Sequence, residues 1–172
     1  MHILTLLHGT ITDRFFRNLT KLGKSRTIKE SFLIQAPPSK VFNHLTSPPK
    51  LKRWFLESAK LSPRKGGNYQ FVWQGGYNHV GKVTDYAKDS KLGLSWPQFW
   101  KGKGVGNTKV TFRLKPKENG TLLQLTHAGY KRAGDSWVEL YAMTYSGWAY
   151  YCMNLKSVIE TGRDLRRQED VF

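Results

Sequence analysis

Residues 137–159, WVELYAMTYSGWAYYCMNLKSVI, decide the fold that we predict for this chain. Asp135 is a suitable N-cap just before them, and no proline interrupts the stretch. Apolar and aromatic side chains recur at the three- and four-residue steps of a helix face, at Trp137, Leu140, Tyr141, Thr144, Trp148, Tyr151, Cys152, Leu155, Val158 and Ile159. We therefore predict one long helix. Gly147 lies inside it at a cost of about 1 kcal/mol relative to alanine, so we expect another part of the protein to pack closely there.

The chain before this helix has the pattern of antiparallel strands. Apolar residues alternate with polar ones in several segments, at residues 28–34, 69–74, 77–88, 91–97, 108–116 and 121–130. Gly75 with Gly76, and Asn119 with Gly120, are suited to the turns between neighbouring strands. Residues 98–107, rich in glycine and lysine, are predicted to form a mobile loop.

Two short helices are predicted between the first two strands, at residues 39–47 and 49–56, because pairs of prolines bound them. The element order predicts an α+β domain. In it a strongly curved antiparallel sheet wraps around the long C-terminal helix, and the two short helices close one end. We place this domain at residues 27–167, after an extension of residues 1–26 and before a tail of residues 168–172.

The extension combines apolar and basic residues. Its apolar group precedes its positive charges, which is the reverse of a secretory signal, so we predict a cytoplasmic protein. Residues 13–22 have the spacing of an amphipathic helix, with Phe15, Phe16, Leu19 and Leu22 on one side and Arg14, Arg17 and Lys21 beside them. Three interpretations stay open for this extension: a helix packed on the domain, a poorly ordered segment, or a contact of residues 13–26 with a membrane surface or a partner.

Length and composition exclude several classes of protein. The chain has 172 residues and a mass of 19.8 kDa, which is the size of one domain. Its apolar runs are too short for a membrane-spanning helix. A single cysteine, Cys152, excludes an internal disulfide and a cysteine-based metal site, and its place on the apolar helix face predicts a buried structural thiol.

The net charge of +16 is the most unusual property of the composition. Long-range attraction of this kind predicts nonspecific binding of nucleic acid at low salt, and a possible acidic protein partner. The basic residues are dispersed along the predicted strands, and no nucleic-acid-binding motif accompanies them. The net charge therefore indicates association with anionic partners and does not indicate a particular reaction.

Two groups of residues resemble a known family. One is the series Ala36, Pro37, Val41, Phe42, Leu45, Trp54, Gly66, Gly67, Tyr69, Gly81, Val83 and Trp96. The other comprises Leu125-Thr126-His127, Gly147-Trp148, Leu155 and residues 160–166. Residues 27–167 are similar in this order and spacing to the START-like (SRPBCC, helix-grip) superfamily, and to its branch of homologues of the activator of heat-shock-protein-90 ATPase. This resemblance implies a cavity between sheet and helix for apolar or amphipathic molecules, and no cofactor.

The candidate ligand-binding residues are the bulky side chains predicted to face one another across this interior. They are Trp54, Phe55, Phe71, Trp73, Val83, Trp96, Phe112, Leu125, His127, Trp137, Tyr141, Tyr145 and Trp148. Such a lining suits a planar or lipid-like ligand, and the open alternative is a solid core without a cavity. His127 either donates a hydrogen bond to a ligand carbonyl or bonds to a neighbouring backbone group.

Our principal functional prediction is a non-enzymatic domain that encloses an apolar or amphipathic small molecule. One alternative is a protein-partner module, acting as a chaperone ATPase activator or stress-response cofactor. A second alternative is a cyclase- or hydrolase-like enzyme that uses the same cavity with Tyr77, Asp85, His127 or Tyr141. No catalytic motif is present, and the five histidines lack the spacing of a metal site, so we predict no catalytic or metal-binding residues.

Overall fold

Seven antiparallel strands form one sheet in this computed structural model, which describes residues 25–100, 103–131 and 136–166. The sheet order is β1-β7-β6-β5-β4-β3-β2. The strands are β1 (Ser25–Ile34), β2 (Ser58–Leu61), β3 (Asn68–Val72), β4 (Asn78–Ala87), β5 (Lys91–Trp100), β6 (Lys103–Lys117) and β7 (Gly120–Lys131). The other elements are α2 (Pro38–Thr46), α3 (Pro48–Leu51), η1 (Gln74–Gly76) and α4 (Ser136–Thr161). The predicted helix at residues 13–22 lies outside the described residues.

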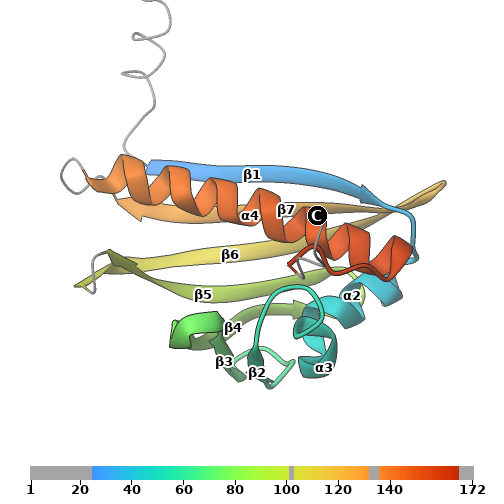
Figure 1. The fold of residues 1–172 in the computed structure, drawn as a ribbon, viewed down its shortest axis with the longest axis horizontal. Helices are drawn as coiled ribbons and strands as arrows, with labels where there is room; N and C mark the ends of the chain where they lie inside the picture. Colours follow the sequence, from blue (N-terminus) through green and yellow to red (C-terminus); the bar gives the residue numbers. More distant parts are fainter. Residues whose placement is uncertain (1–24, 101–102, 132–135, 167–172) are drawn as a thin grey trace, which may run out of the picture.

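The long helix α4 lies across one face of the sheet, alongside β1, β7 and β6 (Figure 1). Its second half supplies the buried side chains Trp148, Cys152, Leu155, Val158 and Ile159. The sheet contributes every second residue of its strands, such as Val110, Phe112 and Leu114 in β6. The predicted α+β helix-grip architecture is therefore confirmed. No helix within the described residues is long and apolar enough to cross a membrane.

The short helices α2 and α3 close one end of the core. The indole of Trp54 is fully buried and donates to the carbonyl of His44 at 2.9 Å, while Asn154 of α4 donates to the carbonyl of Trp54 at 2.7 Å. Helix α3 ends at Leu51, so the prediction of a helix through residue 56 was too long. The reason is local, because the amide of Leu56 bonds to the carbonyl of Leu51, five residues earlier, and the amide of Glu57 already bonds to the carbonyl of Val72 in β3.

The prediction of a mobile loop at residues 98–107 was wrong. Strands β5 and β6 continue through most of this segment, where Gln98 pairs with Gly106 and Phe99 with Gly104. The register shifts between these two pairs, and Gly106 has a φ of 135°. Glycine thus accommodates a bulge that an L side chain would strain, and strand pairing continues past it. The turns predicted at Gly75, Gly76 and Gly120 are confirmed, since each of these glycines has a positive φ.

Candidate functional site

A cleft of about 500 Å³ lies between the first half of α4 and strands β4 and β5. Its walls are mainly aromatic. The ring centroids of Phe55 and Trp73 are 5.2 Å apart, those of Trp73 and Trp96 are 6.0 Å apart, and those of Trp96 and Trp148 are 5.3 Å apart. These separations are those of rings in direct contact, so the four side chains form one continuous wall.

The cleft exists because the first half of α4 leaves space above the sheet. Leu140, Met143, Thr144 and Gly147 line it from the helix. A Cβ atom built on Gly147 would meet no atom within 4 Å, so the expectation that another part of the protein packs closely there was wrong. The missing side chain instead enlarges the cleft.

Tyr77 and His79 supply a polar pair at the cleft. The hydroxyl of Tyr77 lies 2.7 Å from Nε2 of His79. His79 is only 3% exposed, and burial lowers the pKa of its imidazole from 6.5 to about 4. The ring is therefore neutral at physiological pH. Its Nδ1 is buried and has no hydrogen-bond partner among the described residues.

His127 lies beneath the cleft at the centre of a buried hydrogen-bond network. The indole of Trp148 donates to its Nδ1 at 2.9 Å, which requires an unprotonated Nδ1, since indole nitrogen is only a donor. In the neutral ring Nε2 then carries the proton, and Thr108 Oγ1 is its partner at 2.6 Å. Thr108 in turn donates to the carbonyl of Trp96 at 2.8 Å. Burial lowers the pKa of His127 to about 3, with a smaller contribution from His79.

This network extends to the surface of the cleft through Gln98. The Gln98 side-chain amide lies 3.3 Å from the hydroxyl of Tyr130, which itself lies 3.0 Å from Nδ1 of His127. Gln98 is buried and lines the cleft. The side chains below the cleft thus hold three of its lining residues in place, namely Trp96, Gln98 and Trp148.

The predicted site residues occupy three kinds of position. Four of them line the cleft: Phe55, Trp73, Trp96 and Trp148. Six are buried but do not line it: Trp54, Phe71, Val83, Phe112, Leu125 and His127. Tyr141 is half-buried, Tyr145 is 47% exposed, and neither lines the cleft, while the side chain of Trp137 lies outside what the structure describes.

The remaining lining residues were not among the predicted ligand-binding residues, and of them only Tyr77 was considered, for the enzyme alternative. They are Gln74, Tyr77, His79, Gln98, Phe99, Leu140, Met143, Thr144, Gly147 and Tyr151. His79 and Gln98 follow the same alternation as the buried residues of their strands, which is the signal that indicates an inward side chain. The predicted loop at residues 98–107 contains Gln98, which is why the predicted site does not include it.

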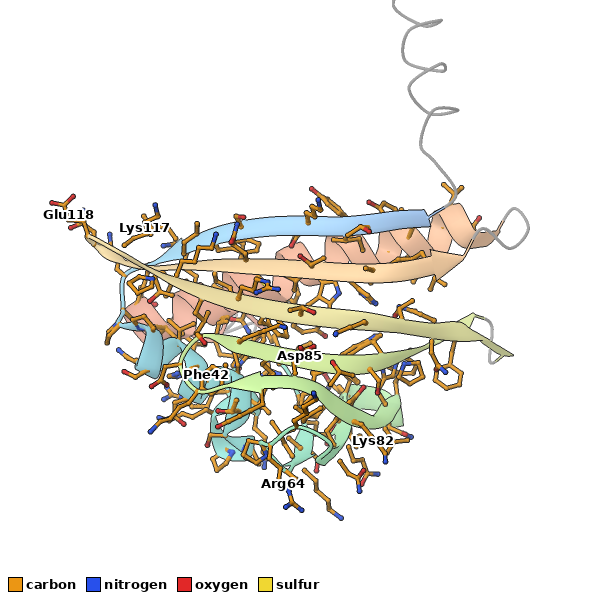
Figure 2. The ribbon with its side chains drawn as sticks, turned by 180° about the vertical axis from the view of Figure 1, so that it is seen from behind. Phe42, Arg64, Lys82, Asp85, Lys117 and Glu118 are labelled. Carbon is orange, nitrogen blue, oxygen red and sulfur yellow. The ribbon has the colours of Figure 1, made fainter. Side chains whose placement is uncertain are left out.

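Asp85 lies away from the cleft, on the face of the sheet opposite α4 (Figure 2). Its carboxylate is 2.6 Å from Nζ of Lys91 and 2.5 Å from Nζ of Lys109. Hydrogen bonds from Lys109 and Lys91 hold its pKa well below the usual range. Of the residues considered for catalysis, Tyr77 alone lines the cleft.

The cleft is electrically neutral in spite of the net charge of the chain. None of its lining residues is Lys, Arg, Asp or Glu. Its polar groups include the amides of Gln74 and Gln98, the hydroxyls of Tyr77, Thr144 and Tyr151, and the neutral imidazole of His79. Among the described residues there is also no group of three or more His, Cys, Asp or Glu side chains placed to hold a metal ion.

Comparison with known families agrees with this architecture. The model of the family described as "Activator of Hsp90 ATPase homolog 1-like protein" matches residues 35–160. The chain belongs to this family. The resemblance to START-like helix-grip proteins is thereby confirmed, and the matched span includes all of the cleft-lining residues. No curated protein matches the chain.

Solved structures of similar fold include several bacterial proteins. A protein from Mesorhizobium loti is 21% identical, with 80% of this chain and 99% of that chain covered and a TM-score of 0.71. The Aha1 dimer from Colwellia psychrerythraea is 25% identical over 80% of this chain and 98% of that chain, with a TM-score of 0.68. CalU16 from Micromonospora echinospora is 27% identical over 83% of this chain and 78% of that chain, with a TM-score of 0.58. The family fold is thus shared across most of the chain.

Proposed function

We propose that this member of the family binds an uncharged, planar aromatic or amphipathic small molecule in the cleft. The observation that carries the proposal is the lining itself, an aromatic wall with scattered neutral polar groups around about 500 Å³ of space. Pockets of this size and composition are typical of small-molecule sites. Burying apolar ligand surface contributes about 25 cal/mol per Å², so enclosure between rings supplies the affinity.

The absence of charge in the lining supports an uncharged ligand. A carboxylate or ammonium group entering the cleft would lose its water without gaining an ionic partner, which is strongly unfavourable. The positive charge of the chain attracts anions to its surface, but no lining residue compensates a negative charge inside the cleft. Hydroxyl, carbonyl or amide groups on the ligand would instead pair with Tyr77, Gln74 or Gln98.

A pair of matched probes tests this proposal. Binding of 2-naphthol and of naphthalene-2-sulfonate is measured by quenching of tryptophan fluorescence, since Trp73, Trp96 and Trp148 line the cleft. We expect 2-naphthol to bind at least about tenfold more tightly, a difference of about 1.4 kcal/mol. Tighter binding of the sulfonate that weakens with added salt would indicate surface attraction and contradict the proposal.

Substitution of Gly147 locates the bound probe. Gly147→Leu places an isobutyl group in the space that a Cβ atom would enter without meeting any atom, so we expect loss of 2-naphthol binding. Ser146→Leu is the matched control, because it adds the same side chain at the neighbouring exposed position, which does not line the cleft. Equal loss of binding in both variants would place the probe outside the cleft.

A second candidate function is docking of an acidic protein partner, such as a chaperone. The observation that favours it is the outward face of the sheet, which carries exposed basic side chains at Lys29, Lys82, Lys109, Arg113 and Lys115. Figure 2 shows this face, with Lys82 and Lys117 labelled. The family is described by activation of a chaperone ATPase, which is consistent with a partner-binding surface.

Charge reversal tests this second candidate. Lys109→Glu with Arg113→Glu is expected to weaken capture of a purified Hsp90-type chaperone at low salt, because opposite potentials drive such association. Lys60→Glu on the edge strand β2 is the control for a change of charge elsewhere on the sheet. Equal binding by all variants, or binding that does not fall with salt, would contradict docking on this face.

A further inference from the structure

The outer face of α4 carries an apolar stripe that the described part of the protein does not cover. Its members follow one another at intervals of three or four residues: Val138, Ala142, Tyr145, Ala149 and Met153. We call this set the outer stripe. Tyr145 and Met153 are each about half exposed, at 47% and 49%. The opposite face of α4 packs on the sheet, so the helix is apolar on two faces. This pattern is typical of a helix that is buried on both faces.

The outer stripe lies on the side of α4 that meets the edge strand β1. Lys156, one turn beyond Met153, donates to the carbonyl of Leu33 in β1 at 2.6 Å. At the other end of the sheet Ser25 pairs with Lys131, only five residues before α4 begins. The chain therefore enters β1 beside the first turn of α4, as Figures 1 and 2 both show.

We propose that residues 13–22 of the same chain form a helix that packs on the outer stripe. Phe15, Phe16, Leu19 and Leu22 give this segment an apolar side of the required kind. A helix of this length is about 15 Å long, and the stripe from Val138 to Ala149 spans about 16 Å. The segment therefore matches the outer stripe in its length, in its position and in its apolar character.

The connection determines the direction of the added helix. Only Gly23 and Lys24 separate Leu22 from β1, so the segment must turn there and run back along α4 in the antiparallel sense. Leu22 then lies toward Val138, and Phe15 lies toward Ala149, where the small alanine side chain leaves room for an aromatic ring. The basic residues of the segment face solvent. The proposal does not depend on the ligand in the cleft.

Methionine oxidation of the full chain tests the proposal. Met153 belongs to the outer stripe, whereas Met143, 63% exposed, lines the cleft and serves as the internal control. Because oxidation by peroxide follows exposure, we expect Met153 to react at least about fivefold more slowly than Met143. The double variant Phe15→Asp with Leu19→Asp should make the oxidation rates of Met153 and Met143 similar. The control double variant Arg14→Ala with Arg17→Ala should leave them different. Equal rates in the unmodified chain overturn the proposal.

Cross-linking distinguishes this occupant from a second copy of the chain. The native Cys152 is fully buried, so introduced cysteines report on their own surroundings. Leu19→Cys with Ala149→Cys is expected to form a disulfide within one chain, while Leu19→Cys with Lys117→Cys, at the far end of the sheet, is not. A dimeric product from Ala149→Cys alone, or protection of Met153 that rises with protein concentration, identifies a second copy and overturns the proposal.

Discussion

Trp148 donates its indole N–H to Nδ1 of His127 across the interface between α4 and β7, at 2.9 Å. One partner lines the cleft and the other is fully buried in the sheet, so this hydrogen bond anchors the cleft wall to the core. His127 is thus a positioning residue for the ring above it.

We expect His127→Leu to lower the free energy of unfolding by about 2–4 kcal/mol, because it leaves the buried Trp148 indole N–H without its acceptor and removes the hydrogen bond between His127 and Thr108. Urea unfolding followed by circular dichroism measures the change. Gln124→Leu on the outward face of the same strand is the control, and it should change stability by less than about 0.5 kcal/mol. Similar losses in both variants would contradict the role of the network.

Stability should fall as the pH is lowered from about 6.5 toward 4. Burial lowers the folded-state pKa of His79 to about 4 and that of His127 to about 3, so the unfolded chain binds these protons first. The stability that the two neutral histidines contribute is complete above pH 6.5 and is lost as the pH falls through their folded-state pKa values. Each histidine adds up to about 1.4 kcal/mol per pH unit in this range. Unfolding measured at several pH values should show a shallower slope in His79→Phe, and an unchanged slope would be inconsistent with a buried neutral imidazole.

Gly147→Ala should raise the free energy of unfolding by about 0.5–1 kcal/mol. Alanine favours the helix over glycine by about this amount, and its Cβ meets no atom within 4 Å. Thermal unfolding is a suitable measurement. The matched contrast is Gly81→Ala in β4, where a Cβ would lie 2.7 Å from the ring of Tyr69, so stability should decrease. A destabilised Gly147→Ala would show that the space at this position is already filled.

Glu30→Gln should stabilise the protein at pH 7. Both carboxylate oxygens of Glu30 are buried without a hydrogen-bond partner among the described residues, and burial raises the pKa of the group. An unsatisfied buried charge costs about 1 kcal/mol or more, which the amide would reduce. Below the raised pKa the native carboxyl is itself neutral, so the difference between the variants should shrink in acid. Glu118→Gln at an exposed turn is the control, and equal effects at both sites would argue against a buried charge.

Much of the fold was predictable from local patterns. The three- and four-residue steps from Leu140 to Ile159 require a helix if their side chains are to share one face, and the alternation in residues 108–130 requires paired strands. Gly75 and Gly120 marked turns because their positive φ angles favour glycine. Where composition was used in place of alternation, at residues 98–107, the prediction was wrong.

The sequence by itself determined most of the helices and strands and which side of each is apolar, because those properties repeat along neighbouring residues. Only the tertiary structure decided that a cleft lies between them. The size of the cleft depends on the distance between the first half of α4 and β5. The contacts of Trp148 with Phe55 and Trp96 determine that distance, and these three residues lie far apart in the chain. Periodicity identifies the side that is buried, but it does not determine whether the opposing side chains fill the space between them.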